Sequence, residues 1–261
     1  METLRAALAR ILSAAPVMKT SFSLALSLAL GLSLLISQRS GLAAAASANS
    51  LTGDEKTAGW KLLFDGKSVT GWRAYNKPSS PPAAGWKAED GVLKKLAGVR
   101  GGDIVTEEQF GDFDLIWEWR VAKAGNNGVK YLVTEQRPSA PGHEYQMIDD
   151  TGHPDSKLGA KRQTAAFYDV LPPSADKVIK PVGEWNASRV VIRGNNVEHW
   201  LNGARVLTYE LGGEAIRTAV AASKFKNAAG FGTKIRGHIM LTDHQDECWF
   251  RNIKILVPAK P

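Results

Sequence analysis

Residues 189–210 read RVVIRGNNVEHWLNGARVLTYE, and two turn signals divide this stretch into three parts. Gly194-Asn195-Asn196 and Asn202-Gly203 separate runs in which apolar and polar side chains alternate. Asn and Gly accept the positive φ angles that tight hairpin turns require. The stretch therefore predicts a three-stranded antiparallel meander.

Short runs of the same kind recur along the chain, rich in β-branched and aromatic residues and separated by Gly, Asn, Asp and Pro. Only Glu214–Lys226 has helical spacing, through Ile216, Val220 and Phe225. Many short strands and one minor helix predict an all-β fold, a two-sheet antiparallel jelly-roll sandwich. Further strands are expected over 60–64, 91–96, 103–105, 113–122, 128–134, 144–149, 165–170, 237–242 and 249–257.

The N-terminal 48 residues have the features of a cleaved signal peptide. Residues 22–36 are apolar and uncharged, Lys19 precedes them, and Ala46-Ser47-Ala48 matches an A-x-A cleavage site. The apolar run of about 15 residues is shorter than the roughly 20 needed to span a bilayer. We expect a periplasmic or secreted protein with no membrane anchor in its mature form.

The rest of the chain is expected to form a single domain. Met18 is an alternative start within the leader, residues 49–58 are expected to be a flexible segment, and 59–258 a single sandwich. The formal charge of +7 for the whole chain falls to about +4 after residue 48, and the two signs are interspersed. This pattern predicts no nucleic-acid partner and leaves the oligomeric state open. Cys248 is the only cysteine, which excludes an intramolecular disulfide.

A first candidate site lies in FDLIWEWRVA, residues 113–122. Period-two alternation places Leu115, Trp117 and Trp119 on one face and Glu118 and Arg120 on the other. Two interpretations stay open for the polar face. Glu118 and Arg120 form a charge pair on a solvated sheet, or they supply a carboxylate and a guanidinium at the floor of a sugar groove.

A second candidate site is HEYQMIDDTGH, residues 143–153. Alternation places Glu144 and Gln146 on one face, and the strand then enters a loop containing Asp149 and His153. Rigidly held loops often carry functional residues. Glu144, Asp149 and His153 are of types that bind divalent metals, although no H-x-x-x-H or H-E-x-x-H spacing is present. A metal cofactor therefore stays an open alternative.

Two further segments contain candidate polar residues. Asn127 lies in the Gly125–Gly128 turn, where it either shapes the turn or binds a hydroxyl. Asp243-His244 follows an apolar strand, and an Asp beside a His can orient an imidazole for acid or base catalysis. The alternative is that Asp243 fixes the turn and His244 caps it.

These segments, in this order, resemble the 3-keto-disaccharide hydrolase domain family, long catalogued only as a domain of unknown function. The resemblance runs through GWKLLFDGKSVTGWR (59–73), GDFDLIWEWRV, GNNGVKY, HEYQMIDD, AAFYDVLPPS, EWNASRVVIRGNNVEHWLNGARVL, GHIMLTDH and WFRNIKI (249–255). It departs from the family pattern at Leu132, where the family usually has Arg, and at Thr242, where it usually has Gln.

The resemblance implies a concanavalin A-like jelly roll, export from a bacterial cell and a carbohydrate substrate oxidised at C3. Its motif positions here are Glu118, Asn127, Gly128, Glu144, Gln146, Asp149, His153, Tyr168, Asp243 and His244. A C3 ketone acidifies the C2 hydrogen, so a base can start an elimination that expels the C1 substituent, and water then adds.

The roles that this chemistry requires lead to the following hypotheses. Glu144 or Glu118 is the base, His153 or His244 is the acid or enolate stabiliser, and Asp149 and Asp243 orient them. A bound metal in place of the histidine is an alternative. Two other functions stay open, a direct glycoside hydrolase with paired carboxylates and a non-catalytic carbohydrate-binding module.

Overall fold

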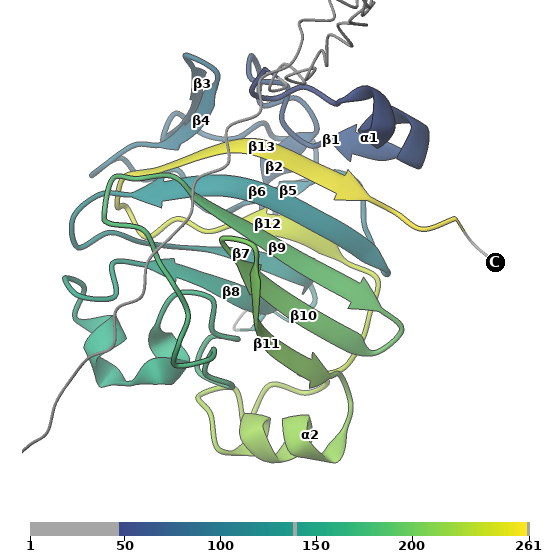
Figure 1. Cartoon of the computed structure of the whole chain (residues 1–261), viewed down its shortest axis with the longest axis vertical. Helices are drawn as coiled ribbons and strands as arrows, with labels where there is room; N and C mark the ends of the chain where they lie inside the picture. The colour runs from purple at the N-terminus through teal and green to yellow at the C-terminus, as the bar shows by residue number, and fades with distance from the viewer. Residues whose placement is uncertain (1–46, 138–139, 260–261) are drawn as a thin grey trace, which may run out of the picture. The chain divides into compact units, whose positions relative to one another are not determined.

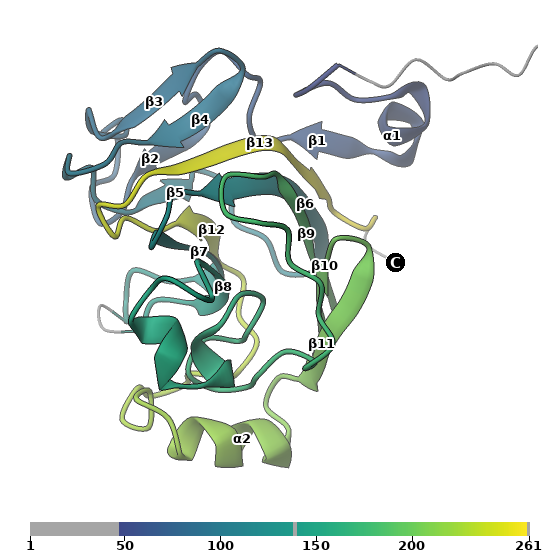
Figure 2. The ribbon, with the colours of Figure 1, turned by 60° about the vertical axis from the view of Figure 1, so that its left-hand side comes forward.

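The computed structural model describes residues 47–137 and 140–259, and within them two antiparallel sheets pack face to face. The larger sheet follows the order β11-β10-β9-β6-β13-β4-β3, and β1 also pairs with β13. The smaller follows β2-β5-β12-β7-β8, and Figures 1 and 2 show the two layers. This arrangement confirms the predicted jelly-roll sandwich. Most of the predicted signal peptide lies outside the described residues.

The larger, eight-stranded sheet consists of β1 (Trp60–Leu62), β3 (Trp86–Glu89), β4 (Val92–Lys95), β6 (Phe113–Val121), β9 (Asn186–Arg193), β10 (Asn196–Leu201), β11 (Ala204–Glu210) and β13 (Cys248–Leu256). The smaller, five-stranded sheet consists of β2 (Trp72–Ala74), β5 (Ile104–Thr106), β7 (Asn126–Val133), β8 (His143–Ile148) and β12 (His238–Leu241). The helices are α1 (Gly53–Ala58), α2 (Glu214–Ala221) and the 3-10 turns η1 (Asp155–Leu158) and η2 (Ala160–Arg162).

The predicted meander is present as β9, β10 and β11. The register pairs Asn196 with Arg193 in the first hairpin and Leu201 with Ala204 in the second. Asn202 and Gly203 both have positive φ, 49° and 86°, as a tight turn requires. The turn residues therefore adopt the conformation that the sequence predicted.

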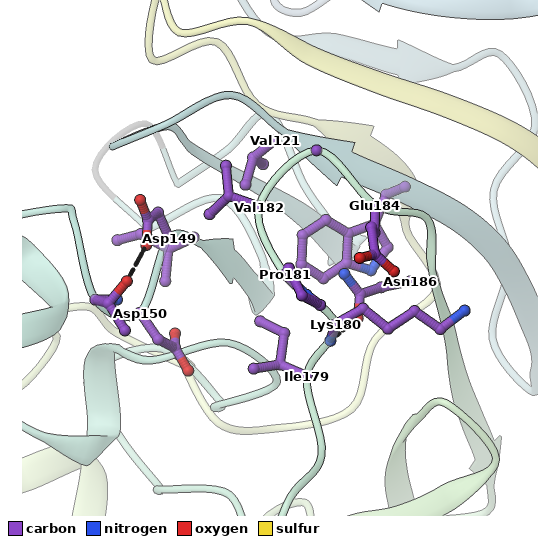
Figure 3. A pocket seen from close by; sticks show the side chains of 13 residues that line it. Val121, Asp149, Asp150, Ile179, Lys180, Pro181, Val182, Glu184 and Asn186 are labelled. Atoms are coloured by element: carbon purple, nitrogen blue, oxygen red, sulfur yellow. Dashed lines mark hydrogen bonds between the residues drawn. The ribbon is translucent and has the colours of Figure 1, made fainter.

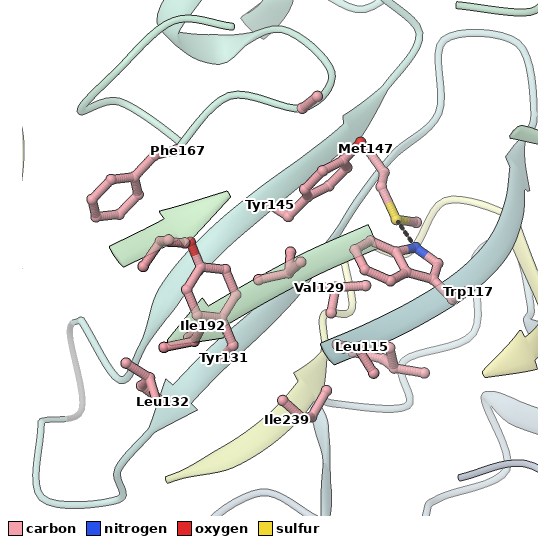
Figure 4. Close-up of a cluster of buried hydrophobic side chains, with 14 of the residues drawn as sticks. Leu115, Trp117, Val129, Tyr131, Leu132, Tyr145, Met147, Phe167, Ile192 and Ile239 are labelled. Atoms are coloured by element: carbon pink, nitrogen blue, oxygen red, sulfur yellow. Dashed lines mark hydrogen bonds between the residues drawn. The ribbon is translucent and has the colours of Figure 1, made fainter. Parts of the chain in front are cut away.

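The core lies between the sheets and combines aliphatic with large aromatic side chains (Figure 4). Trp117 of β6 meets Tyr145 of β8 edge to face, with ring centroids 5.0 Å apart. Its indole N–H also points at the sulfur of Met147, at 3.3 Å. One side chain of the larger sheet thus contacts two residues of the same strand in the smaller one, which fixes how the sheets face each other.

Three expectations differ from the structure. Residues 165–170 form no strand, because Ala165 and Asp169 have positive φ and the segment turns after pairing briefly along β8. The expected helix ends at Ala221 rather than Lys226. The segment expected to be flexible, 49–58, contains α1, which a Thr52–Glu55 capping box stabilises.

We predict that Trp117→Ala lowers the free energy of unfolding by about 3–5 kcal/mol, because the indole is 2% exposed and its loss leaves a cavity between the sheets. Leu158→Ala is the control, since Leu158 is 71% exposed and contributes little to packing. Urea unfolding followed by tryptophan fluorescence measures both. A loss below about 1 kcal/mol in Trp117→Ala would contradict this view of the core.

Candidate functional site

The strand pair β7–β8 presents a charged group on the outer face of the five-stranded sheet. Val129 and Tyr145, paired in register, belong to the core, so their neighbours Lys130 and Glu144 point the other way. The Lys130 ammonium lies 3.7 Å from a Glu144 carboxylate oxygen, and both side chains are mostly buried. The predicted alternation of Glu144 and Gln146 against Tyr145 and Met147 is therefore correct.

The Glu144 carboxylate lies over a residue that has no side chain. Gly128 is opposite Gln146 in the register, and a Cβ added at Gly128 would overlap the Glu144 carboxylate. The segment after η2 lies along the edge strand β8, where the Tyr168 N–H donates to the Glu144 carbonyl at 3.1 Å. Glu144 is consequently only 7% exposed although it faces away from the core.

A second carboxylate, Asp103, reaches this site from the residue before β5. Burial raises the pKa of Asp103, and the charge of Glu144 raises it further. Three interactions lower the pKa of Asp103 without cancelling its rise. They are the charge of Lys130, a hydrogen bond from the Asp243 N–H and the charge of His244. Sequence reasoning missed Asp103, because nothing in the sequence indicates that β5 lies two strands away from β7.

Tyr168 connects this group to a network of charged side chains. Its hydroxyl donates to Asp155 at 2.8 Å, and Arg162 contacts both Asp155 and Asp169. Burial raises the pKa of the Tyr168 hydroxyl, and the bond to Asp155 raises it further. Tyr168 is therefore a neutral hydrogen-bonding group next to Glu144.

Two buried amide oxygens near these residues have no hydrogen-bond partner among the described residues. They are Oε1 of Gln146 and Oδ1 of Asn126. Buried polar atoms are rarely left unpaired in native proteins, so each of these two calls for a partner from outside the chain. Both oxygens lie on the strand pair that holds Glu144.

Glu118 and Arg120 are not part of this group. They lie on the outer face of the eight-stranded sheet, so the core separates them from Glu144. Glu118 accepts a hydrogen bond from Arg251 at 2.6 Å, and the Arg120 guanidinium lies between the rings of Trp185 and Trp249. Glu118 and Glu144, the two alternatives for the base, therefore lie on opposite faces of the sandwich. Alternation gives the face of a strand but not the sheet to which the strand belongs.

Asn127 and Asp149 hydrogen-bond to the backbone. Asn127 is fully buried and donates to the Thr242 carbonyl at 2.8 Å while accepting from Gly128 N–H. Burial raises the pKa of Asp149, but hydrogen bonds from Ala124, Gly152 and Thr151 outweigh it and leave the pKa below its usual value. Both residues shape the loops beside the site rather than face a substrate.

Asp243 belongs to a buried ion pair that orders the loop before Asp103. Lys95 contacts an Asp243 oxygen at 2.8 Å and the carbonyls of Leu96 and Val99. The other Asp243 oxygen accepts from the N–H groups of Gly101 and Gly102, both at 2.7 Å. His244, the next residue, is exposed at the rim, where its charge acts on Asp103.

His153 lies at the start of η1 rather than over Glu144. Its ring Nδ1 accepts the Asp155 N–H at 3.0 Å, just before this turn begins. Residues 47–137 and 140–259 contain no group of three or more His, Cys, Asp or Glu side chains arranged to hold a metal ion. Glu144, Asp149 and His153 therefore do not form the ligand set that the sequence left open.

A separate pocket of about 190 Å³ opens at one edge of the sandwich (Figure 3). Its walls are mainly apolar, from Trp119, Val121, Ile179 and Val182, with Asp149 and Asp150 at one side. Asp150 accepts from Lys177 and Thr164, and Asp149 is held by the backbone. Glu184 and Lys180 also line this pocket, and neither forms a salt bridge within residues 47–137 and 140–259. The Glu144 group is the better candidate site because its carboxylate lies 3.7 Å from the Lys130 ammonium and interacts with a second carboxylate, Asp103.

We predict that the Lys95–Asp243 pair makes stability depend on pH. Burial raises the pKa of Asp243, but Lys95 and the N–H groups of Gln245, Gly101 and Gly102 outweigh it and keep the pKa below its usual value. The charged form therefore stabilises the fold above about pH 4, and this contribution is lost as the pH falls through the lowered pKa. Asp243→Asn should lower the free energy of unfolding, measured with urea, by about 3–5 kcal/mol near pH 7 and by progressively less below pH 4. A difference that does not change with pH would contradict this role.

A family model and a curated relative both match most of the chain. Residues 59–256 match the model of the 3-keto-alpha-glucoside-1,2-lyase-like domain. A 3-keto-disaccharide hydrolase of Bacteroides thetaiotaomicron is 35% identical over 233 residues, covering 76% of this chain and 78% of that protein.

Two solved structures, both putative glycosyl hydrolases from Parabacteroides distasonis, share the fold. The first is 33% identical with a TM-score of 0.73, covering 81% of this chain and all of the other. The second is 26% identical with a TM-score of 0.58, covering 76% and 99%. The chain belongs to the family of 3-keto-alpha-glucoside-1,2-lyase-like domains.

Proposed function

We propose that this protein cleaves 3-keto-glycosides, including 3-keto-disaccharides, on the outer face of the five-stranded sheet. The family and the relative named a 3-keto-disaccharide hydrolase support the substrate class. The observation that carries the proposal is the group of the buried Glu144 with the half-buried Lys130 and Asp103, which combines two carboxylates with a cation. Elimination across C1 and C2 needs a base, an acid and a cation, and this group contains all three.

In the proposed reaction Glu144 removes the proton from C2, and the electrons move onto the C3 oxygen. Lys130 stabilises the resulting enolate, since a preorganised cation in a buried site is most effective where negative charge develops. The C1–oxygen bond then breaks, and the leaving group takes a proton. Water adds at C1, C2 regains a proton, and the free 3-keto sugar is released.

Asp103 is the proposed proton donor to the leaving group. An acid whose pKa is raised by burial stays protonated at a higher pH than an ordinary aspartate, as a general acid requires. This assigns to Asp103 a role that the sequence had suggested for His153 or His244. His244 acts on Asp103 through its charge at the rim.

Two alternatives make different demands on the structure. A direct glycoside hydrolase would use the same pair of carboxylates, Asp103 and Glu144, without proton abstraction at C2. A non-catalytic binding module would use exposed indoles for stacking. Trp185, Trp200 and Trp249 instead stack against arginines of the eight-stranded sheet, away from Glu144.

We also propose that the protein is exported, on the basis of the apolar run 22–36 and the small residues at 46–48. In the described part of the chain, no helix has the length and apolar character needed to cross a membrane. Sequencing the N-terminus of the protein recovered from the periplasm or medium tests this proposal. A mature N-terminus near Asn49 is the expected result.

We predict that Glu144→Gln lowers kcat/KM for 3-keto-trehalose by at least about 100-fold, because the amide cannot accept the C2 proton. Glu118→Gln is the matched control, since it changes the same functional group on the opposite face of the sandwich and should retain wild-type activity. Release of 3-keto-glucose by the purified mature protein is the measurement. An active Glu144→Gln variant would rule out this base.

We predict that Gly128→Ala lowers kcat/KM by about tenfold or more, because the added methyl group displaces the Glu144 carboxylate and misplaced catalytic groups lose rate steeply. Gly111→Ala is the control, because nothing lies within 4 Å of a Cβ at that position. Melting temperatures of both variants show that the fold is retained. Full activity in Gly128→Ala would mean that the observed carboxylate position is not the working one.

A further inference from the structure

A pocket of about 340 Å³ lies in the loop after α2. It is lined by Ala140, Lys224, Phe225, Asn227 and Ala228. Its volume falls within the range of small-ligand sites, about 300–1,000 Å³. We propose that this pocket binds the leaving-group sugar of a disaccharide substrate and that Lys224 contacts that sugar. The inference rests on the proposed function and specifies its substrate class.

Lys224 links the pocket to the catalytic carboxylate. Its ammonium lies 4.0 Å from the ring centroid of Tyr168, and the Tyr168 N–H donates to the Glu144 carbonyl. The Lys224 N–H donates to Asp169 at 2.7 Å, which anchors the start of the loop to the same segment. The charges of Glu144 and Lys130 both act on Lys224. A sugar in the pocket would therefore lie beside the ring that is cleaved.

The Lys224 ammonium is free to bind a ligand. Within the described residues it packs on Tyr168 and Phe225 rather than on a carboxylate. A cation held by aromatic faces keeps its N–H groups available, and each can donate to a sugar hydroxyl.

The remaining lining residues suit a pyranose. Phe225 stacks on Phe231 with ring centroids 4.3 Å apart, which holds its side chain in place at the wall of the pocket. Asn227 adds an amide that both donates and accepts hydrogen bonds. The lining of this pocket is mainly polar, which suits the hydroxyl groups of a sugar. A methyl or other small leaving group would leave most of this pocket unused.

The test compares two substrates that differ only in the leaving group. These are 3-keto-trehalose, which releases glucose, and methyl 3-keto-α-glucoside, which releases methanol. Wild type, Lys224→Met, Lys224→Arg and Lys226→Met are each assayed for kcat/KM with both. Lys226 is the matched control, because it is an exposed lysine two residues further on that does not line the pocket.

We expect Lys224→Met to lower kcat/KM for the disaccharide about tenfold more than for the methyl glycoside, the loss expected of one charge-assisted hydrogen bond. Lys224→Arg should restore part of this loss, and Lys226→Met should have no effect. Activity on the methyl glycoside also shows that each variant is folded. Equal losses on both substrates, or no loss, would overturn the inference alone. A wild-type protein that cleaves neither substrate would overturn the proposed function, and this inference with it.

Discussion

The pleat of the strand pair β7–β8 is the constraint on which both the core and the candidate site depend. Tyr145 and Met147 point inward, where Trp117 contacts both, and this packing holds the strand in register with the larger sheet. The residue between two inward side chains must point outward, so the same packing directs Glu144 to the opposite face. A shift of one residue would exchange the two faces and lose the core and the site together.

The outward face of this strand pair is nevertheless largely shielded from solvent. The segment after η2 lies along β8, and Glu144 and Gln146 are 7% and 1% exposed. Charges in such an environment interact more strongly than in water. This strengthens both the attraction between Glu144 and Lys130 and the repulsion between Glu144 and Asp103. The loops therefore provide what the flat face of an antiparallel sheet lacks, a site from which water is largely excluded.

The sequence predicted the elements well and the site only in part. Alternation placed Glu144 and Gln146 on the polar face of their strand, and turn chemistry gave the meander. The strands β2 and β3 were missed because neither contains a β-branched residue, whereas β4 and β5, which are equally short, contain Val92 and Ile104. Candidates that proved to bind the backbone, such as Asp149 and Asp243, have the same side chain as a catalytic aspartate, and only their partners distinguish them. Asp103 and Lys224 come from segments that become neighbours of Glu144 only after folding.

The central claim is that cleavage begins with loss of the C2 proton to a group on this face. The most direct test is turnover of 3-keto-trehalose by the wild-type protein in deuterated water, with the released 3-keto-glucose analysed by NMR and mass spectrometry. Free 3-keto-glucose incubated without protein controls for spontaneous exchange. Elimination and hydration predict one deuterium at C2 of the oxidised product, because that position is reprotonated from solvent. Product formed at full rate with hydrogen retained at C2 would contradict the account and favour direct hydrolysis by the two carboxylates.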